Sequence, residues 1–174
     1  SPSLLAAGLY DGTVVVYDVR NKHNKPIYES TVRTQKHTDP VWQVKWYCSP
    51  EVEKDVFVFF SISSDGKVYK WSFIKNKNSF DQEEIVILKY TDSQNELATA
   101  GVDIDTKDKG EENLVFGNSG GMCFDFNPHK NYTHYFVIGT EEGHIQLCSV
   151  MHRGHHIQSF EGHTMGVYSV TWNP

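Results

Sequence analysis

Short hydrophobic runs recur along this chain with the spacing of β-strands. Many alternate with polar residues over four to eight positions, whereas the 3.6-residue period of an amphipathic helix is nearly absent. Gly, Asp, Asn and Pro separate the runs, and turns between strands favour these residues. The pattern therefore predicts an all-β protein.

One hairpin unit occurs three times, each copy having a hydrophobic strand, an acidic residue followed by glycine, and an alternating strand. The three copies are residues 5–17, 59–71 and 136–148. Gly12, Gly66 and Gly143 align without gaps. An Asp-Gly pair suits a type I′ turn because both residues tolerate positive φ. Glu142 fits that turn less well, so a different geometry is expected for the third hairpin.

A strand with large hydrophobic residues at alternate positions also recurs, with Trp46, Phe126 and Trp172 aligned. Its copies are residues 37–50, 117–128 and 163–174. A fourth run completes each unit, at residues 26–32, 84–90 and 156–160. Four short antiparallel strands per repeat predict propeller blades. Phe126 and Trp172 are 46 residues apart, close to the usual blade period of about 40–45 residues.

These units resemble WD40 repeats: Gly162-His163 matches the GH dipeptide, and Tyr17-Asp18 stands in for the Trp-Asp pair. The resemblance implies a partial WD40 β-propeller over residues 1–174, with about three blades' worth of strands. The expected segments are an incomplete blade (4–32), a blade (36–90), an acidic insert loop (91–116), a second blade (117–160) and the first strand of another blade (163–174). WD40 propellers commonly have about seven blades, within the general range of four to eight, so we expect a fragment of a longer protein.

The middle copy matches the structural tetrad of WD40 repeats, in which buried hydrogen bonds link His and Asp through Ser and Trp. The matching residues are His37, Ser61, Asp65 and Trp71. The first copy departs from the pattern with Ala7 and Tyr17. The third departs at every position and is expected to hold together by packing alone; its residues are Gly117, Ile138, Glu142 and Cys148.

Three longer stretches, LLAAGLYDGTVVVYDVR, HTDPVWQVKW and GTEEGHIQLCS, resemble axonemal dynein intermediate chains, above all the first type of outer-arm chain. The resemblance implies a non-catalytic subunit whose propeller binds the dynein heavy-chain tail and supports docking on the ciliary microtubule doublet. It also implies a second intermediate chain and light chains as partners, the latter through regions absent here. The implied location is the cytoplasm and cytoskeleton, in the axoneme of a cilium or flagellum.

Charge and composition narrow the classes of partner. The net charge of −6 argues against nucleic-acid binding, and no hydrophobic run is long enough to span a membrane. Between residues 91 and 113 there are seven acids and only two bases, so this segment could meet a basic partner or be a solvated linker. Three widely spaced cysteines favour reduced thiols. No phosphate-binding loop is evident, and no cofactor is expected.

Three groups of residues could suggest chemistry instead. Ser, His and Asp within the tetrad could form a hydrolase triad, although their spacing follows the repeat. GNSGG at 117–121 resembles the segment around the nucleophile of trypsin-like proteases, but no matching His and Asp segments surround it. A metal cluster could be written from Cys148, His152, His155 and His156, although a strand end and a turn separate their side chains. Another WD40 adaptor, such as a cytoplasmic dynein intermediate chain, or a propeller-based enzyme or ligand-binding protein remains the alternative.

Blade topology places the candidate partner surface on one face. The turns between the second and third strands of each blade share that face with the loops that lead into the next blade. Trp42 also shares a strand face with Val44 and Trp46, so a core position is its alternative. The candidate contact residues are Tyr10, Asp39, Trp42, Lys67, Glu141 and Met165.

Overall fold

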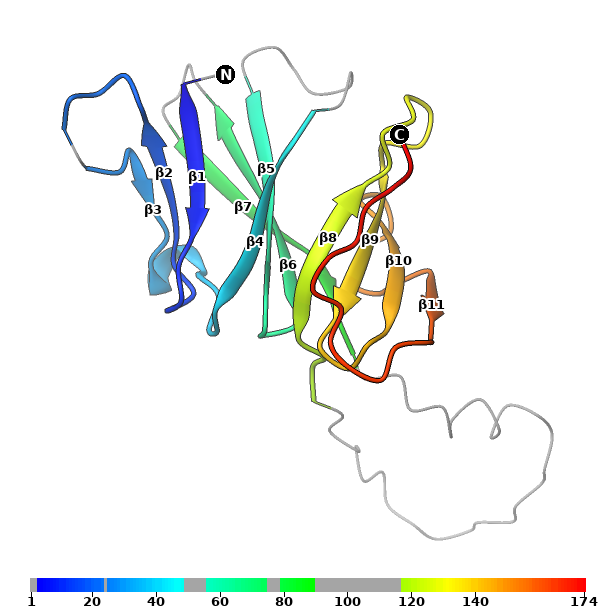
Figure 1. The fold of residues 1–174 in the computed structure, drawn as a ribbon. Helices are drawn as coiled ribbons and strands as arrows, with labels where there is room; N and C mark the ends of the chain where they lie inside the picture. The colour runs from blue at the N-terminus through cyan, green and yellow to red at the C-terminus, as the bar shows by residue number, and fades with distance from the viewer. Residues whose placement is uncertain (1–2, 24, 49–55, 75–78, 90–116) are drawn as a thin grey trace, which may run out of the picture.

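Three antiparallel sheets lie one after another in the computed structural model (Figure 1). The structure describes residues 3–23, 25–48, 56–74, 79–89 and 117–174. The all-β prediction is confirmed, and sheets of three and four strands fit part of a WD40 propeller. The expected insert at 91–116 lies outside the described residues. Within those residues, no helix is both long and apolar enough to cross a membrane.

The first sheet has the order β1-β2-β3, formed by Leu4–Gly8, Val14–Asp18 and Tyr28–Glu29. The second has the order β4-β5-β6-β7, formed by Val41–Tyr47, Val56–Ser63, Lys67–Ile74 and Ser79–Ile87. The third has the order β11-β10-β9-β8; in chain order, its strands are Gly121–Phe126, Tyr135–Thr140, Ile145–Ser149 and Gln158–Phe160. Each four-stranded sheet therefore consists of sequential strands joined as a meander.

Two outer strands differ from their expected ranges. The run at 26–32 forms only the two-residue β3, because the chain turns into the 3₁₀ helix η1 at Val32–Thr34. The run at 84–90 belongs to a strand that begins earlier, at Ser79, because β7 pairs with the whole length of β6. The hydrophobic pattern did not mark the start of β7, since its first six residues are polar apart from Phe80.

All three hairpin turns share one geometry, so the type I′ prediction is wrong. In each turn the glycine N–H donates to the carbonyl three residues earlier: Gly12 to Leu9, Gly66 to Ser63, and Gly143 to Thr140. Only the glycines have positive φ, at 83°, 75° and 98°. A type I′ turn needs positive φ at both central residues, whereas a three-residue loop closed by a left-handed glycine does not. Glu142 is therefore as acceptable as Asp.

The C-terminal residues 163–174 run beside β8 (Figure 1) but form no strand, contrary to expectation. Their hydrogen bonds to the third sheet are isolated ones: the Val167 N–H donates to the Thr140 carbonyl, and the Cys123 thiol to the Val167 carbonyl. The Trp172 N–H donates to Asp125 Oδ2 over 2.8 Å. A strand needs a continuous backbone partner, and the third sheet offers this segment only isolated bonds.

Two hydrophobic cores fill the spaces between the sheets. Phe59 points toward the first sheet and packs with Val14 and Val16, whereas Phe60 and Ile62 point toward the third. Since β5 is buried on both faces, it reads as a nearly continuous hydrophobic run, VFVFFSIS. The second sheet is therefore the centre of the described structure.

At one level of each interface a glycine allows close approach. A Cβ added to Gly121 would lie 2.5 Å from side-chain carbons of Ile62, closer than real carbons pack. At the other two contacts the sizes are exchanged. The glycine lies on the earlier sheet, and the valine lies on the segment that follows that sheet in the chain. The close pairs are Gly8 with Val41, Ile62 with Gly121, and Gly139 with Val167.

Candidate functional site

The four tetrad residues come together in the second sheet. His37 is fully buried, with Nδ1 2.9 Å from Asp65 Oδ2 and Nε2 2.8 Å from Ser61 Oγ. Trp71 Nε1 donates to the same Ser61 Oγ over 2.8 Å. A carboxylate only accepts hydrogen bonds, so Nδ1 is the donor to Asp65. The contacts link the loop before β4, strand β5, the β5–β6 turn and strand β6 into one buried chain.

Asp65 is the most strongly bonded member of this chain. Its carboxylate also accepts the backbone N–H groups of Thr38 at 3.1 Å and Lys67 at 2.9 Å. Burial alone would raise the pKa of Asp65, but the hydrogen bond and charge of His37, with these two N–H groups, lower it below its usual value. The folded protein therefore favours the ionised carboxylate.

Two residues outside the tetrad also contact it. The Tyr69 ring lies against the His37 ring, with centroids 4.5 Å apart, and Thr38 supplies the backbone donor to Asp65. Tyr69 lies two residues before Trp71 on the same strand face. That period-2 position is the signal from which sequence reasoning could have included it.

The position of Ser61 suits a structural role rather than that of a nucleophile. Its side chain is fully buried, and its oxygen lies between the His37 ring and the Trp71 indole. A nucleophile needs access to a substrate carbonyl, and this hydroxyl has no solvent exposure. Ser119 in GNSGG is also buried, and its hydroxyl donates to Glu142 rather than to a histidine.

The proposed metal ligands do not converge. Among the described residues, no group of three or more His, Cys, Asp and Glu side chains is arranged to hold a metal ion. Cys148 is fully buried, and burial raises the pKa of its thiol to about 12. A thiol with that pKa stays protonated at neutral pH and is a poor metal ligand.

The third sheet contains a different set at the tetrad positions. Ile138 and Cys148 are fully buried in the core shared with the second sheet. Packing is not the sole interaction there, because the Ser119 hydroxyl donates to the Glu142 carboxylate. Glu142 therefore keeps a polar role at the position of Asp65 without a histidine partner.

The predicted contact residues surround one edge of the sheets, at the bottom of Figure 1. We call this edge the turn face; it consists of the β1–β2, β5–β6 and β9–β10 turns with residues 36–42 and 163–166. Its parts are in close contact: a Cβ on Gly12 would lie 2.2 Å from the His37 carbonyl oxygen, and one on Gly143 2.4 Å from that of His163. The turns and loops thus form a continuous surface.

Exposure differs among the six candidates. Tyr10 is 83% exposed, Met165 74% and Trp42 49%, so Trp42 is a partly covered surface residue rather than part of the core. The Trp42 indole donates to Ser64 Oγ, which fixes its orientation. Asp39 and Glu141 are exposed, and Glu141 accepts the Gly120 N–H over 3.2 Å. Lys67 is committed to Glu84, with Nζ–Oε2 at 3.1 Å.

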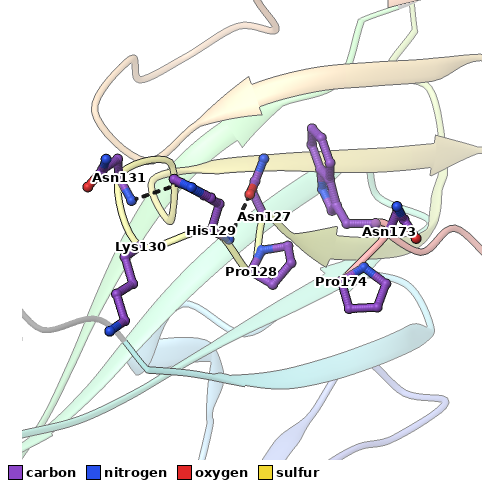
Figure 2. Close-up of a pocket in the computed structure, with 8 residues that line it drawn as sticks. Asn127, Pro128, His129, Lys130, Asn131, Asn173 and Pro174 are labelled. Atoms are coloured by element: carbon purple, nitrogen blue, oxygen red, sulfur yellow. Dashed lines mark hydrogen bonds between the residues drawn. The ribbon is translucent and has the colours of Figure 1, made fainter.

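The opposite edge has a hollow of about 680 Å³ beside the β8–β9 loop (Figure 2). Most of its lining surface is apolar, contributed in part by one indole and two prolines, although the other lining residues are polar. The lining residues are Asn127, Pro128, His129, Lys130, Asn131, Trp172, Asn173 and Pro174. None of the predicted contact residues lies there, so the hollow and the turn face are separate surfaces.

Comparison with known proteins agrees with this geometry. A WD domain, G-beta repeat model matches residues 154–174. The chain is 38% identical over 179 residues to dynein axonemal intermediate chain 4 of Mus musculus, covering 100% of this chain and 21% of that protein. It is 36% identical to dynein axonemal intermediate chain 1 of Mus musculus, covering 99% of this chain and 22% of that protein.

A third relative extends the similarity to an alga. The 78 kDa intermediate chain of the flagellar outer arm dynein of Chlamydomonas reinhardtii is 37% identical over 171 residues, which cover 98% of this chain and 23% of that protein. The chain therefore spans about a fifth of the length of these curated relatives.

The repeated sheets, the buried tetrad and the repeat model matched at residues 154–174 are consistent with part of a protein of the WD40 propeller class. Within that class, the chain is homologous over its whole length to a segment of axonemal dynein intermediate chains. This homology supports a location in the axoneme of a cilium or flagellum.

Proposed function

We propose that this chain forms part of the WD40 propeller of a non-catalytic scaffold subunit in an axonemal dynein motor complex. The observation that carries the proposal is identity of 34–38% along essentially the whole chain to axonemal dynein intermediate chains. The proposed segments are those expected from the repeats: an incomplete blade at 4–32, blades at 36–90 and 117–160, an insert at 91–116, and residues 163–174, which would pair as the first strand of the next blade in the whole propeller. The proposed tetrad residues stabilise the middle blade.

The proposed partner of the turn face is the tail of a dynein heavy chain. Tyr10 and Met165 support this role, since they are large side chains with most of their surface free for contact. The second intermediate chain and the light chains would belong to the same complex, the light chains mainly through parts of the protein outside this segment. Association with the microtubule doublet would then be indirect.

The test uses the full-length protein within its complex. Replacing Tyr10 and Met165 with Ala should reduce the amount of heavy chain that copurifies, while the melting temperature stays unchanged. Tyr132, 52% exposed in the β8–β9 loop at the opposite edge, provides the matched Ala control. Cross-linking mass spectrometry should join Lys36 or Lys67, rather than Lys130, to the heavy chain. An equal loss with the Tyr132 variant, or heavy-chain cross-links confined to Lys130, would refute the proposed contact face.

A further inference from the structure

The interface between the second and third sheets contains buried polar atoms without partners. Gln146 on β10 is fully buried, yet neither its Nε2 nor its Oε1 has a hydrogen-bond partner among the described residues. The buried Oγ of Ser159 on β11 likewise lacks one within that part of the chain. Native proteins provide partners for the large majority of such buried atoms, so this cluster needs a physical account.

These atoms belong to one place in the fold. Gln146 and Ser159 are register partners of the β10–β11 pair, and opposite residues in an antiparallel pair project from the same sheet face. Cys148, two positions along β10 on that face, belongs to the same buried hydrophobic cluster as Val86 and Leu88, in and just after β7. The three unpartnered atoms therefore face the space between the sheets.

The β10–β11 connection also contacts the second sheet. The Gly154 N–H, in the β10–β11 connection, donates to the Ile85 carbonyl over 2.8 Å. Arg153 forms an ion pair with Glu83 of β7 beside this bond. The connection thus joins the outer strand of the second sheet to the third sheet.

The second sheet has a different residue at the position of Gln146. Tyr69 occupies the position of Gln146, three residues after the turn glycine, and its ring packs on His37. The apolar ring of a tyrosine needs no hydrogen-bond partner where it packs on another ring. A primary amide, in contrast, needs acceptors for its N–H groups and a donor for its oxygen. With glutamine at this position, the third sheet has a buried amide for which the described residues provide no hydrogen-bond partner.

We propose that an internal water molecule binds between Gln146 and Ser159 and bridges the amide to the hydroxyl. Buried waters typically make about three hydrogen bonds to otherwise unsatisfied groups, and these two side chains offer both donors and acceptors. The bound water is part of the third sheet's core and replaces the His37–Tyr69 contact of the second.

A map of the full-length protein at a resolution that shows ordered waters tests the site directly. Density for a water should lie within about 2.7–3.2 Å of both side chains and should vanish in the Gln146→Leu variant. A Gln146 amide bonded directly to Ser159 Oγ, with no water density, would overturn the proposal.

A double-mutant cycle in melting temperature provides the second readout. Ser159→Ala alone should lower the melting temperature by a few degrees, whereas in the Gln146→Leu background it should change little, because the bridge is already lost. Gln158→Leu is the matched control, since Gln158 is the exposed neighbour on β11, and it should have no such coupling to Ser159. Additive effects of Gln146→Leu and Ser159→Ala would overturn the bridge.

Discussion

The second and third sheets have the same four-strand topology but different interiors. In the second, a chain of hydrogen bonds through His37, Ser61, Asp65 and Trp71 joins the first strand's loop to the hairpin. In the third, Ile138 and Cys148 fill the corresponding positions, and only Glu142 retains a polar contact. The fold therefore tolerates loss of the tetrad, provided that hydrophobic contacts replace it.

Both sheets keep the turn glycine. Gly66 and Gly143 have positive φ, and a Cβ on either would come within 2.8 Å of a backbone carbonyl oxygen in the following loop. Close approach of turn and loop is thus common to the sheets, whereas buried polar chemistry is specific to one. The comparison predicts that substitutions at equivalent positions have unequal effects.

The largest difference is expected between Trp71→Ala and Cys148→Ala. Trp71 is fully buried and packs against Phe59 and Tyr28, so its removal should cost about 3–5 kcal/mol of unfolding free energy. Cys148→Ala deletes one sulfur and should cost only about 1 kcal/mol. Urea unfolding of the two variants measures the difference, and equal losses would show that the two interiors are energetically equivalent.

His37→Ala should come next, with a loss of about 2–3 kcal/mol, because Asp65 and Ser61 would each lose one buried hydrogen-bond partner. His23→Ala is the matched control: His23 is exposed, and its removal should change stability by less than about 0.5 kcal/mol. Thermal melting of both variants is the measurement. An unchanged melting temperature for His37→Ala would contradict the structural role of the tetrad.

The exchanged glycine contact predicts a coupled pair. Gly121→Val should cost about 1–3 kcal/mol by overpacking against Ile62. Ile62→Ala in the same chain should relieve part of that loss, since the pair then approaches the arrangement of Gly139 with Val167. Stability measurements on the single and double variants give the coupling energy, and strictly additive losses would contradict direct contact.

The smallest effect is expected in acid. The pKa of Asp65 is lowered in the folded protein, so its contribution is fully present above the pKa of the unfolded carboxyl, about 3.9, and is lost as pH falls through the lower folded value. Asp65→Asn should therefore reduce the decline of stability below pH about 4. Urea midpoints measured across this range test it, and an unaltered pH profile would refute a lowered pKa.

Local signals in the sequence were sufficient for much of the fold. The acid-glycine pairs located all three hairpins, and their alternating neighbours located the paired strands. The resemblance to WD40 repeats selected the residues that form the buried chain around His37. These features depend on residues close in sequence or on a repeated template, which is why periodicity detects them.

Other features depended on what lies across space. The alternation that grouped Trp42 with Trp46 could not decide its burial, because that depends on the side chains opposite it; Trp42 is 49% exposed. Residues 163–174 have the alternating pattern of a strand, which is why a strand was expected there. A strand forms only where a neighbouring strand supplies backbone hydrogen bonds. The buried Gln146 was unremarkable in sequence, since its lack of partners arises from the packing of two sheets.

The sequence by itself determined the repeat, the positions of the turn glycines and the residues able to build a tetrad, because each is a local requirement on backbone conformation or side-chain type. Only the tertiary structure decided the common turn geometry, the exchange of glycine between facing strands, and which polar groups became enclosed. Those outcomes are set by distances between segments far apart in the chain, and no single segment carries that information.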